Sequence, residues 1–209
     1  MGKTAEYIRL NPDQPDSKVI GQIVKALQNG AVIIYPTDTV YGIGCDISQP
    51  KAIEKIAKIK GTKAKQANLA IVCHNLSHLA NYVKPISNTV FRVLKKYLPG
   101  AFTFILPANT NVPKVFNTKK KEVGIRVPDH LIPRQIVEEL GNPIVTTSVV
   151  DLDELIEYTM DPQMIYERFK DQVDIVIDGG YGNNIPSTVV LVDNEDFEVV
   201  REGMGEFME

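Results

Sequence analysis

The segment from Tyr35 to Asp46, YPTDTVYGIGCD, contains the densest set of residues that could form a ligand-binding site. It follows a short β-branched run that predicts a buried strand, and α/β sheets usually open their ligand sites at such strand ends. Thr37 and Thr39 supply hydroxyls, while Gly42 and Gly44 let a ligand approach the backbone closely. A turn that needs proline and glycine only for its shape would look the same. Residues further along the chain favour a ligand loop.

Cations elsewhere in the chain could face an anion. Lys60 ends a predicted helix and opens a loop that adds Lys63 and Lys65. These three lysines could bind a triphosphate. A solvent-exposed helix end and loop without a ligand would show the same lysine pattern. Arg126 lies inside the strand-like run VGIRV, where an unpaired guanidinium is costly to bury, so it needs a carboxylate or phosphate partner. Arg201 lies in a similar run, VVREG.

Two hydroxyl groups complete the candidate set. Ser148 lies near the end of a predicted strand, and Ser187 follows the turn-rich sequence NNIP directly before another strand. Such hydroxyls can bind phosphate or amino-acid oxygens, and they also cap helices and close turns.

The sequence excludes several common sites. No P-loop and no dinucleotide-binding glycine motif lies between a predicted strand and helix. No cysteine and histidine spacing suits zinc, so we predict no metal site. Cys45 and Cys73 are expected to be buried thiols of a reducing compartment. Three histidines are expected to be surface residues or hydrogen-bonded ones: His74, His78 and His130.

Composition narrows the class of protein. The 209 residues are 44% hydrophobic and 23% charged, which is enough for a sizeable core without disulfides. A formal net charge of -3 gives no overall attraction to nucleic acid or anionic membrane, so a polyanion would need a local patch. No signal peptide and no apolar run of roughly 20 residues is present. We therefore expect one cytoplasmic domain over residues 1–209, with no membrane association.

Helical and strand-like periods alternate over the first two-thirds of the chain, and strands gather after it. Helices are predicted over residues 17–29, 50–60, 77–83, 87–98 and 133–140, and from residue 161 onward. Strands are predicted over residues 31–35, 68–73, 101–106, 123–127, 143–150, 173–178, 188–192 and 197–201. This order predicts an α/β fold with one twisted mixed β-sheet and flanking helices, and not a doubly wound parallel sheet.

These motifs resemble those of the YrdC/YciO family. The segments YPTDTVYGIGCD, PGAFTFIL, VGIRVPDHLI, IDGGYGNNIPSTVV and VVREG match it in order, and the likeness runs from about residue 7 to about residue 206. The STxV and VVREG segments look closest to the YciO branch. The resemblance implies the YrdC-like fold. Its best characterised members make threonylcarbamoyl-AMP from ATP, threonine and bicarbonate for tRNA modification, and were first noted for binding double-stranded RNA in a basic concavity.

The resemblance also implies roles for single residues. Thr37 and Arg126 would hold a threonine-like substrate. ATP, accompanied by Mg²⁺, would contact four further residues: Lys60, Ser148, Ser187 and Arg201. Of these, Lys60 and Arg201 would be catalytic, because they would stabilise the displaced pyrophosphate.

Two positions depart from the synthase motifs. Lys-x-Arg is replaced by Lys60-Gly61-Thr62, and Ser-x-Asn is replaced by Ser148-Val149-Val150. A threonine cannot supply the bidentate fork of an arginine, and a valine lacks the donor and acceptor of an amide. We expect a synthase activity that is weak or altered.

A protein of a different class would keep the cleft without catalysis and bind double-stranded RNA or tRNA. Its support is a set of lysines in an otherwise acidic chain, which a solubilising loop would also contain. These lysines are Lys60, Lys63, Lys65, Lys114, Lys119, Lys120 and Lys121. A small-molecule phosphate sensor that uses the same cleft is a third possibility.

Overall fold

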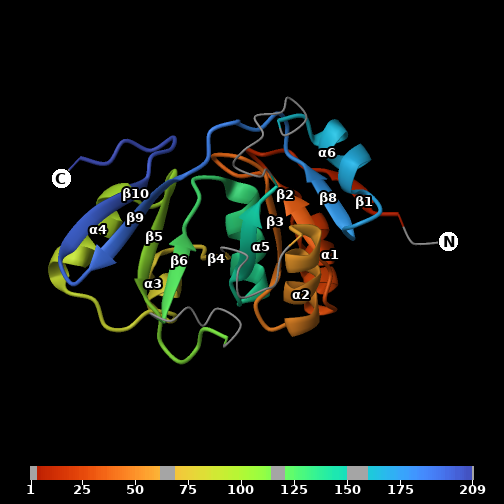
Figure 1. Cartoon of the computed structure of the whole chain (residues 1–209). Helices are drawn as coiled ribbons and strands as arrows, with labels where there is room; N and C mark the ends of the chain where they lie inside the picture. The colour runs from red at the N-terminus through yellow and green to blue at the C-terminus, as the bar shows by residue number, and fades with distance from the viewer. Residues whose placement is uncertain (1–3, 62–68, 114–120, 150–159, 209) are drawn as a thin grey trace.

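The computed structural model describes residues 4–61, 69–113, 121–149 and 160–208 (Figure 1). The strands are β1 (Glu6–Arg9), β2 (Ile33–Tyr35), β3 (Gly42–Asp46), β4 (Ala70–Val72), β5 (Phe102–Pro107), β6 (Glu122–Arg126), β7 (Ile144–Ser148), β8 (Ile175–Asp178), β9 (Thr188–Asp193) and β10 (Asp196–Arg201). The helices are α1 (Ser17–Gln28), α2 (Pro50–Ile59), α3 (Leu76–Ala80), α4 (Asn88–Tyr97), α5 (Leu131–Leu140) and α6 (Pro162–Phe169). Each predicted helix and strand has a counterpart, with bounds that differ by a few residues.

The described strands form one ten-stranded sheet in the order β1-β8-β2-β3-β7-β4-β6-β5-β9-β10. The pairs β1–β8, β2–β8, β4–β6 and β5–β9 are parallel, whereas β2–β3, β3–β7, β4–β7, β5–β6 and β9–β10 are antiparallel. The predicted mixed α/β sheet with flanking helices is therefore confirmed.

The two faces of the sheet carry separate hydrophobic cores. Ile33 and Tyr35 of β2 pack with the apolar faces of α1 and α5, whereas Ile34 between them belongs to the other core. That second core also takes buried residues from α2, α3, α4 and α6. This alternation along β2 follows from the two-residue period of a strand that is covered on both faces.

Local caps decide where the helices begin and end. Asp16 caps α1 by accepting a hydrogen bond of 2.8 Å from the Lys18 N–H. His130 caps α5 through Nδ1, so this helix begins at Leu131 rather than at the predicted residue 133. Gly141 ends α5 in the left-handed region, with φ at 74°. None of the helices in the described parts of the chain has the length and apolarity that a membrane span needs.

The sequence interpretation of residues 35–46 as one ligand loop is wrong for its second half. Residues 42–46 form β3, a fully buried strand between β2 and β7. A Cβ atom on Gly44 would lie 2.4 Å from Ile144 Cγ2 and 2.6 Å from the Val145 carbonyl oxygen, so this glycine permits close packing of strands. The edge strand β1 was also missed, because its four residues include a glutamate and an arginine and are only partly buried.

The buried cysteines and one pair of histidines lie within this framework. Cys45 and Cys73 are free buried thiols, as predicted, and burial raises the pKa of Cys45 to about 12. His74 and His78 face each other with 2.9 Å between their Nδ1 atoms, so only one of these nitrogens carries a hydrogen. His78 is buried rather than on the surface; its Nδ1 is hydrogen-bonded to His74, whereas its Nε2 has no hydrogen-bond partner among the described residues.

The buried His78 predicts a loss of stability in mild acid. Burial, with a smaller contribution from His74, lowers its pKa from 6.5 to about 4. Between these two values the unfolded chain binds more protons than the folded chain, so the free energy of unfolding falls as the pH falls. We expect the thermal midpoint of the parent to drop more steeply between about pH 7 and about pH 5 than that of His78→Phe. Equal slopes in the two proteins would contradict this.

Candidate functional site

A buried ion pair joins the end of β6 to the loop after β2. Arg126 Nη2 donates to Asp38 Oδ1 over 2.8 Å and to Thr39 Oγ1 over 2.9 Å. The second carboxylate oxygen of Asp38 accepts a 3.0 Å hydrogen bond from the Asp129 N–H. The carboxylate partner that the sequence requires for Arg126 is therefore Asp38. Arg126 Nε is buried and has no hydrogen-bond partner among the described residues.

The hydroxyls of Thr37 and Thr39 give this loop its shape. Thr37 Oγ1 donates to the Val40 carbonyl over 2.8 Å and accepts a 3.0 Å hydrogen bond from the Thr39 N–H. The two hydroxyl oxygens lie 3.1 Å apart, and both threonines are buried. A turn stabilised by its own side chains thus presents Thr39 to Arg126. Direct contact between Thr37 and a substrate stays a prediction.

A second arginine organises the segment that precedes β9. Arg201 Nη2, at the end of β10, donates to the Ser187 carbonyl over 2.6 Å and approaches its Oγ at 3.3 Å. The Ser187 hydroxyl also lies 2.8 Å from Thr103 Oγ1 of β5. Thr103 was missed in the sequence, although a threonine within the apolar run FTFIL is a signal of a buried polar contact.

The two arginines lie close enough to influence each other. Burial lowers the pKa of Arg201, and the positive charge of Arg126 lowers it further. Arg126 also acts on Tyr35: burial raises the pKa of this phenol to about 12, while its hydrogen bond to Thr146 and the charge of Arg126 oppose that rise. Two partly desolvated guanidinium groups near each other favour the binding of an anion between them.

Lys60 and Ser148 meet on the other side of β3. Lys60 caps the end of α2, and its Nζ donates to the Ser148 carbonyl over 3.2 Å. Ser148 is paired in register with Gly42, which in turn lies opposite Tyr35 of β2. Neighbouring strands therefore connect the Lys60 group to the region of Tyr35 and Arg126.

Several predicted residues lie outside the described part of the chain. They are Lys63, Lys65, Lys114, Lys119 and Lys120 of the basic face, and Thr62 and Val150 of the altered motifs. Lys121 is described, and its carbonyl accepts a 2.8 Å hydrogen bond from the Ala108 N–H. The basic face stays a prediction.

The described groups have donors that suit an anion better than a metal ion. Guanidinium and ammonium groups are present together with hydroxyls, and Asp38, the carboxylate that contacts Arg126, is engaged by it. Within residues 4–61, 69–113, 121–149 and 160–208, no cluster of three histidine, cysteine or acidic side chains could hold a metal ion. The prediction of no protein metal site agrees with these donors but is not tested by them.

Comparison with known proteins shows the family to which the chain belongs. The chain belongs to the Sua5/YciO/YrdC family, whose model, described as telomere recombination, matches residues 25–203. It is similar to YciO of Escherichia coli strain K12, an uncharacterized protein, with 36% identity over 204 residues that cover 97% of each chain. It is also 31% identical over 129 residues to a threonylcarbamoyl-AMP synthase of Photobacterium profundum, covering 61% of this chain and 69% of that protein.

Solved structures agree with the sequence relatives. The crystal structure of E. coli YciO matches with a TM-score of 0.89 at 35% identity and covers 97% of both chains. A variant of P. abyssi Sua5 matches with a TM-score of 0.83 at 25% identity, covering 95% of this chain and 57% of the other. The predicted YrdC/YciO resemblance and its fold are confirmed.

The Asp38–Arg126 pair predicts a large effect of removing the carboxylate. Both side chains are only 11% exposed, so Asp38→Ala would leave a buried guanidinium without its charged partner. We expect the free energy of unfolding, measured with urea, to fall by about 3 to 5 kcal/mol.

A matched control is the exposed pair between Lys55 and Asp174, whose atoms also lie 2.8 Å apart. Because water screens this pair, Lys55→Ala should cost less than about 1 kcal/mol. Similar small losses in both variants would mean that Arg126 finds compensation elsewhere.

Proposed function

We propose that this protein binds ATP and a threonine-like amino acid around Arg126, Ser187 and Arg201, and forms threonylcarbamoyl-AMP more slowly than an intact synthase. The single observation that carries the proposal is the placement of two partly desolvated guanidinium groups in one region: Arg201 donates to Ser187, Ser187 contacts Thr103 of β5, and β5 pairs with β6, which carries Arg126. Burial lowers the pKa of Arg201, and the charge of Arg126 lowers it further. An anion bound between them would relieve this repulsion, and a nucleotide triphosphate or an amino-acid carboxylate supplies such an anion.

The family supports the choice of substrate. Its members include proteins named threonylcarbamoyl-AMP synthase, one of which is 28% identical to this chain over 177 residues. We assign Thr37 and Arg126 to the amino acid, and Lys60, Ser148, Ser187 and Arg201 to the nucleotide. Mg²⁺ would accompany ATP as the counterion of its phosphates.

The chemistry needs no covalent attachment to the protein. The threonine amine attacks bicarbonate and water is lost, giving a carbamate. A carbamate oxygen then attacks the α-phosphorus of ATP, the bond to the β-phosphate breaks, and pyrophosphate leaves. Lys60 and Arg201 would hold the leaving pyrophosphate, because positioning and charge stabilisation are the main contributions of a protein to such transfers.

The reduced rate is proposed from the two altered motifs. By the family resemblance, Thr62 and Val150 would stand where the synthase motifs have an arginine and an asparagine. Loss of two polar groups that contact the reacting phosphates could remove several kcal/mol of transition-state stabilisation.

The test is ATP–pyrophosphate exchange that depends on both threonine and bicarbonate. We expect slow exchange in the parent and faster exchange in the double variant Thr62→Arg/Val150→Asn. Lys60→Ala should bind ATP roughly tenfold or more weakly in calorimetry, because a hydrogen bond to a charged group contributes about 1.5 to 3 kcal/mol.

The control for Lys60→Ala is Lys58→Ala, since Lys58 is an exposed cation of the same helix turn. This variant should bind ATP like the parent. ATP binding without exchange in the parent and in the double variant would favour a sensor over an enzyme. Equal ATP affinity of Lys60→Ala and the parent would remove Lys60 from the site.

The alternative is a binder of double-stranded RNA or tRNA. It is favoured by the segment from Lys114 to Lys121, KVFNTKKK, which has four lysines in eight residues. Binding of this kind would contact phosphates, ignore base sequence and weaken steeply with salt. In a gel mobility-shift experiment, the protein should then bind duplex RNA at low salt. Charge reversal at Lys119, Lys120 and Lys121 should weaken this binding and flatten its salt dependence.

Two matched variants serve as controls in that experiment. Lys95→Glu reverses an exposed charge on α4, and Thr37→Ala alters the proposed amino-acid site. Both should leave RNA affinity unchanged. If the triple reversal binds duplex RNA as well as the parent does, the lysine segment is a solvated loop.

A further inference from the structure

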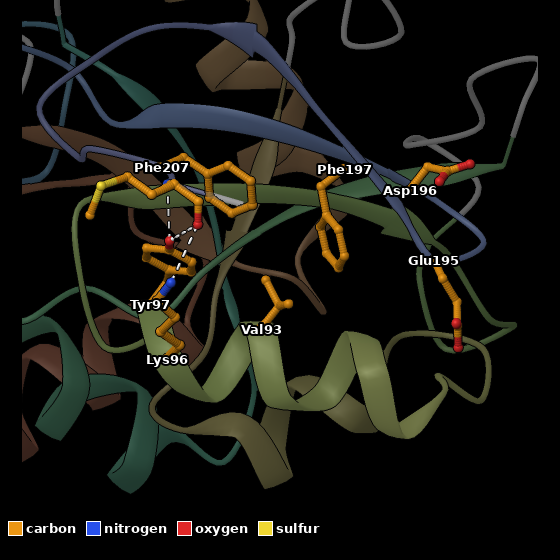
Figure 2. Close-up of a pocket in the computed structure, with 8 residues that line it drawn as sticks. Val93, Lys96, Tyr97, Glu195, Asp196, Phe197 and Phe207 are labelled. Carbon is orange, nitrogen blue, oxygen red and sulfur yellow. Dashed lines mark hydrogen bonds between the residues drawn. The ribbon is translucent and has the colours of Figure 1, made fainter.

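The residues that follow β10 fold back over α4, and we call residues 202–208 the arm. Tyr97 of α4 holds the far end of the arm: its hydroxyl donates to the Met208 carbonyl over 2.6 Å and accepts from the Met208 N–H over 3.0 Å. Lys96 donates to the same carbonyl over 3.3 Å. Figure 2 shows these contacts beside the ring of Phe207.

Phe207 anchors the arm through aromatic packing. Its ring centroid lies 4.8 Å from that of Tyr97, 5.9 Å from Phe197 and 6.3 Å from Phe102. Beside it, a pocket of about 330 Å³ opens between α4 and β10, with Val93 and Phe197 on its walls (Figure 2). The anchor is therefore a partly buried apolar contact at the edge of the hydrophobic core, beside an open pocket.

The first residues of the arm, which directly follow β10, contact the backbone of Pro186 and Ser187. The Met204 N–H donates to the Pro186 carbonyl over 2.8 Å. A Cβ atom on Gly203 would lie 2.3 Å from that carbonyl oxygen and 2.5 Å from the carbonyl carbon of Ser187, so the two backbones are in direct contact.

Thr188 and Gly205 add a second contact between the arm and the segment that carries Ser187. Thr188 Oγ1 donates to the Gly205 carbonyl over 2.5 Å. A Cβ atom on Gly205 would lie 2.5 Å from Phe102 Cζ, so the arm fits here only because residue 205 has no side chain. Ser187 is consequently held between Thr103 of β5 and the arm, while Arg201 donates to it from the residue before the arm.

We propose that Phe207 is a positioning residue: its ring seats the arm, and the arm fixes Ser187 and Arg201 in the geometry that binds a nucleotide polyphosphate. The ligand half of this proposal rests on the proposed function; the structural half does not. Phe207 packs on Tyr97, Phe197 and Phe102, and it acts on the site through Gly205, Met204 and Pro186.

The experiment compares Phe207→Ala with Met208→Ala. Met208 contributes backbone groups to the hydrogen bonds with Tyr97, and its side chain is exposed, so the control leaves the arm in place. In Phe207→Ala we expect faster amide hydrogen exchange at residue 204 and at residues 187–188. We also expect roughly tenfold weaker binding of ATP with Mg²⁺, which corresponds to about 1.4 kcal/mol. Met208→Ala should match the parent in both measurements.

A double variant separates positioning from a general loss of stability. If Phe207 acts through Arg201, Phe207→Ala should weaken ATP binding in the parent but add little in an Arg201→Ala background. Additive losses in the double variant, or unchanged exchange in Phe207→Ala, would overturn the proposal. Should Phe207→Ala fail to fold, Tyr97→Phe removes only the hydroxyl that holds residue 208 and should give the same changes in smaller size.

The two proposals fail in different ways. If the parent does not bind ATP, the proposed function is wrong, and hydrogen exchange alone then decides whether Phe207 positions Ser187. If the parent binds ATP and Phe207→Ala binds it equally well, the arm has no part in binding and only this inference is lost.

Discussion

The burial of Arg126 is the constraint on which the site depends. A guanidinium that is almost removed from water needs a carboxylate, and Asp38 supplies it from a loop 88 residues earlier in the chain. That pairing fixes the loop after β2 against the end of β6, while the Asp129 N–H holds the second oxygen of Asp38. The hydroxyls of Thr37 and Thr39 are thereby set in one arrangement.

A close approach of strands fixes the neighbouring part of the sheet. Gly42 and Gly44 lie in β3 without side chains, which leaves room for the ring of Tyr35. The Tyr35 hydroxyl then donates to Thr146 over 2.7 Å, so that β2 and β7 are linked across β3. β7 also carries Ser148, whose carbonyl accepts the hydrogen bond from Lys60, so the same strand connects Lys60 to the arginine region.

Charge balance gives the site its chemical character. Asp38 compensates one arginine, whereas Arg201 donates to a serine carbonyl and has its pKa lowered by burial and by Arg126. The region therefore keeps an excess of positive charge in partly desolvated surroundings. In the proposed function these groups are already ordered before an anionic ligand arrives, which would reduce the cost of ordering them on binding.

The sequence by itself determined the helices, the mixed sheet, the family and the requirement for a partner to Arg126, because hydrophobic periodicity depends on neighbouring residues. It did not determine the N-terminal caps of α1 and α5, which are Asp16 and His130 in the structure. Only the tertiary structure decided that the partner is Asp38, that residues 42–46 form a central strand and that Thr103 contacts Ser187. Each of these depends on which strands lie side by side. Contacts between residues far apart in the chain follow from the topology of the sheet, and no local pattern encodes them.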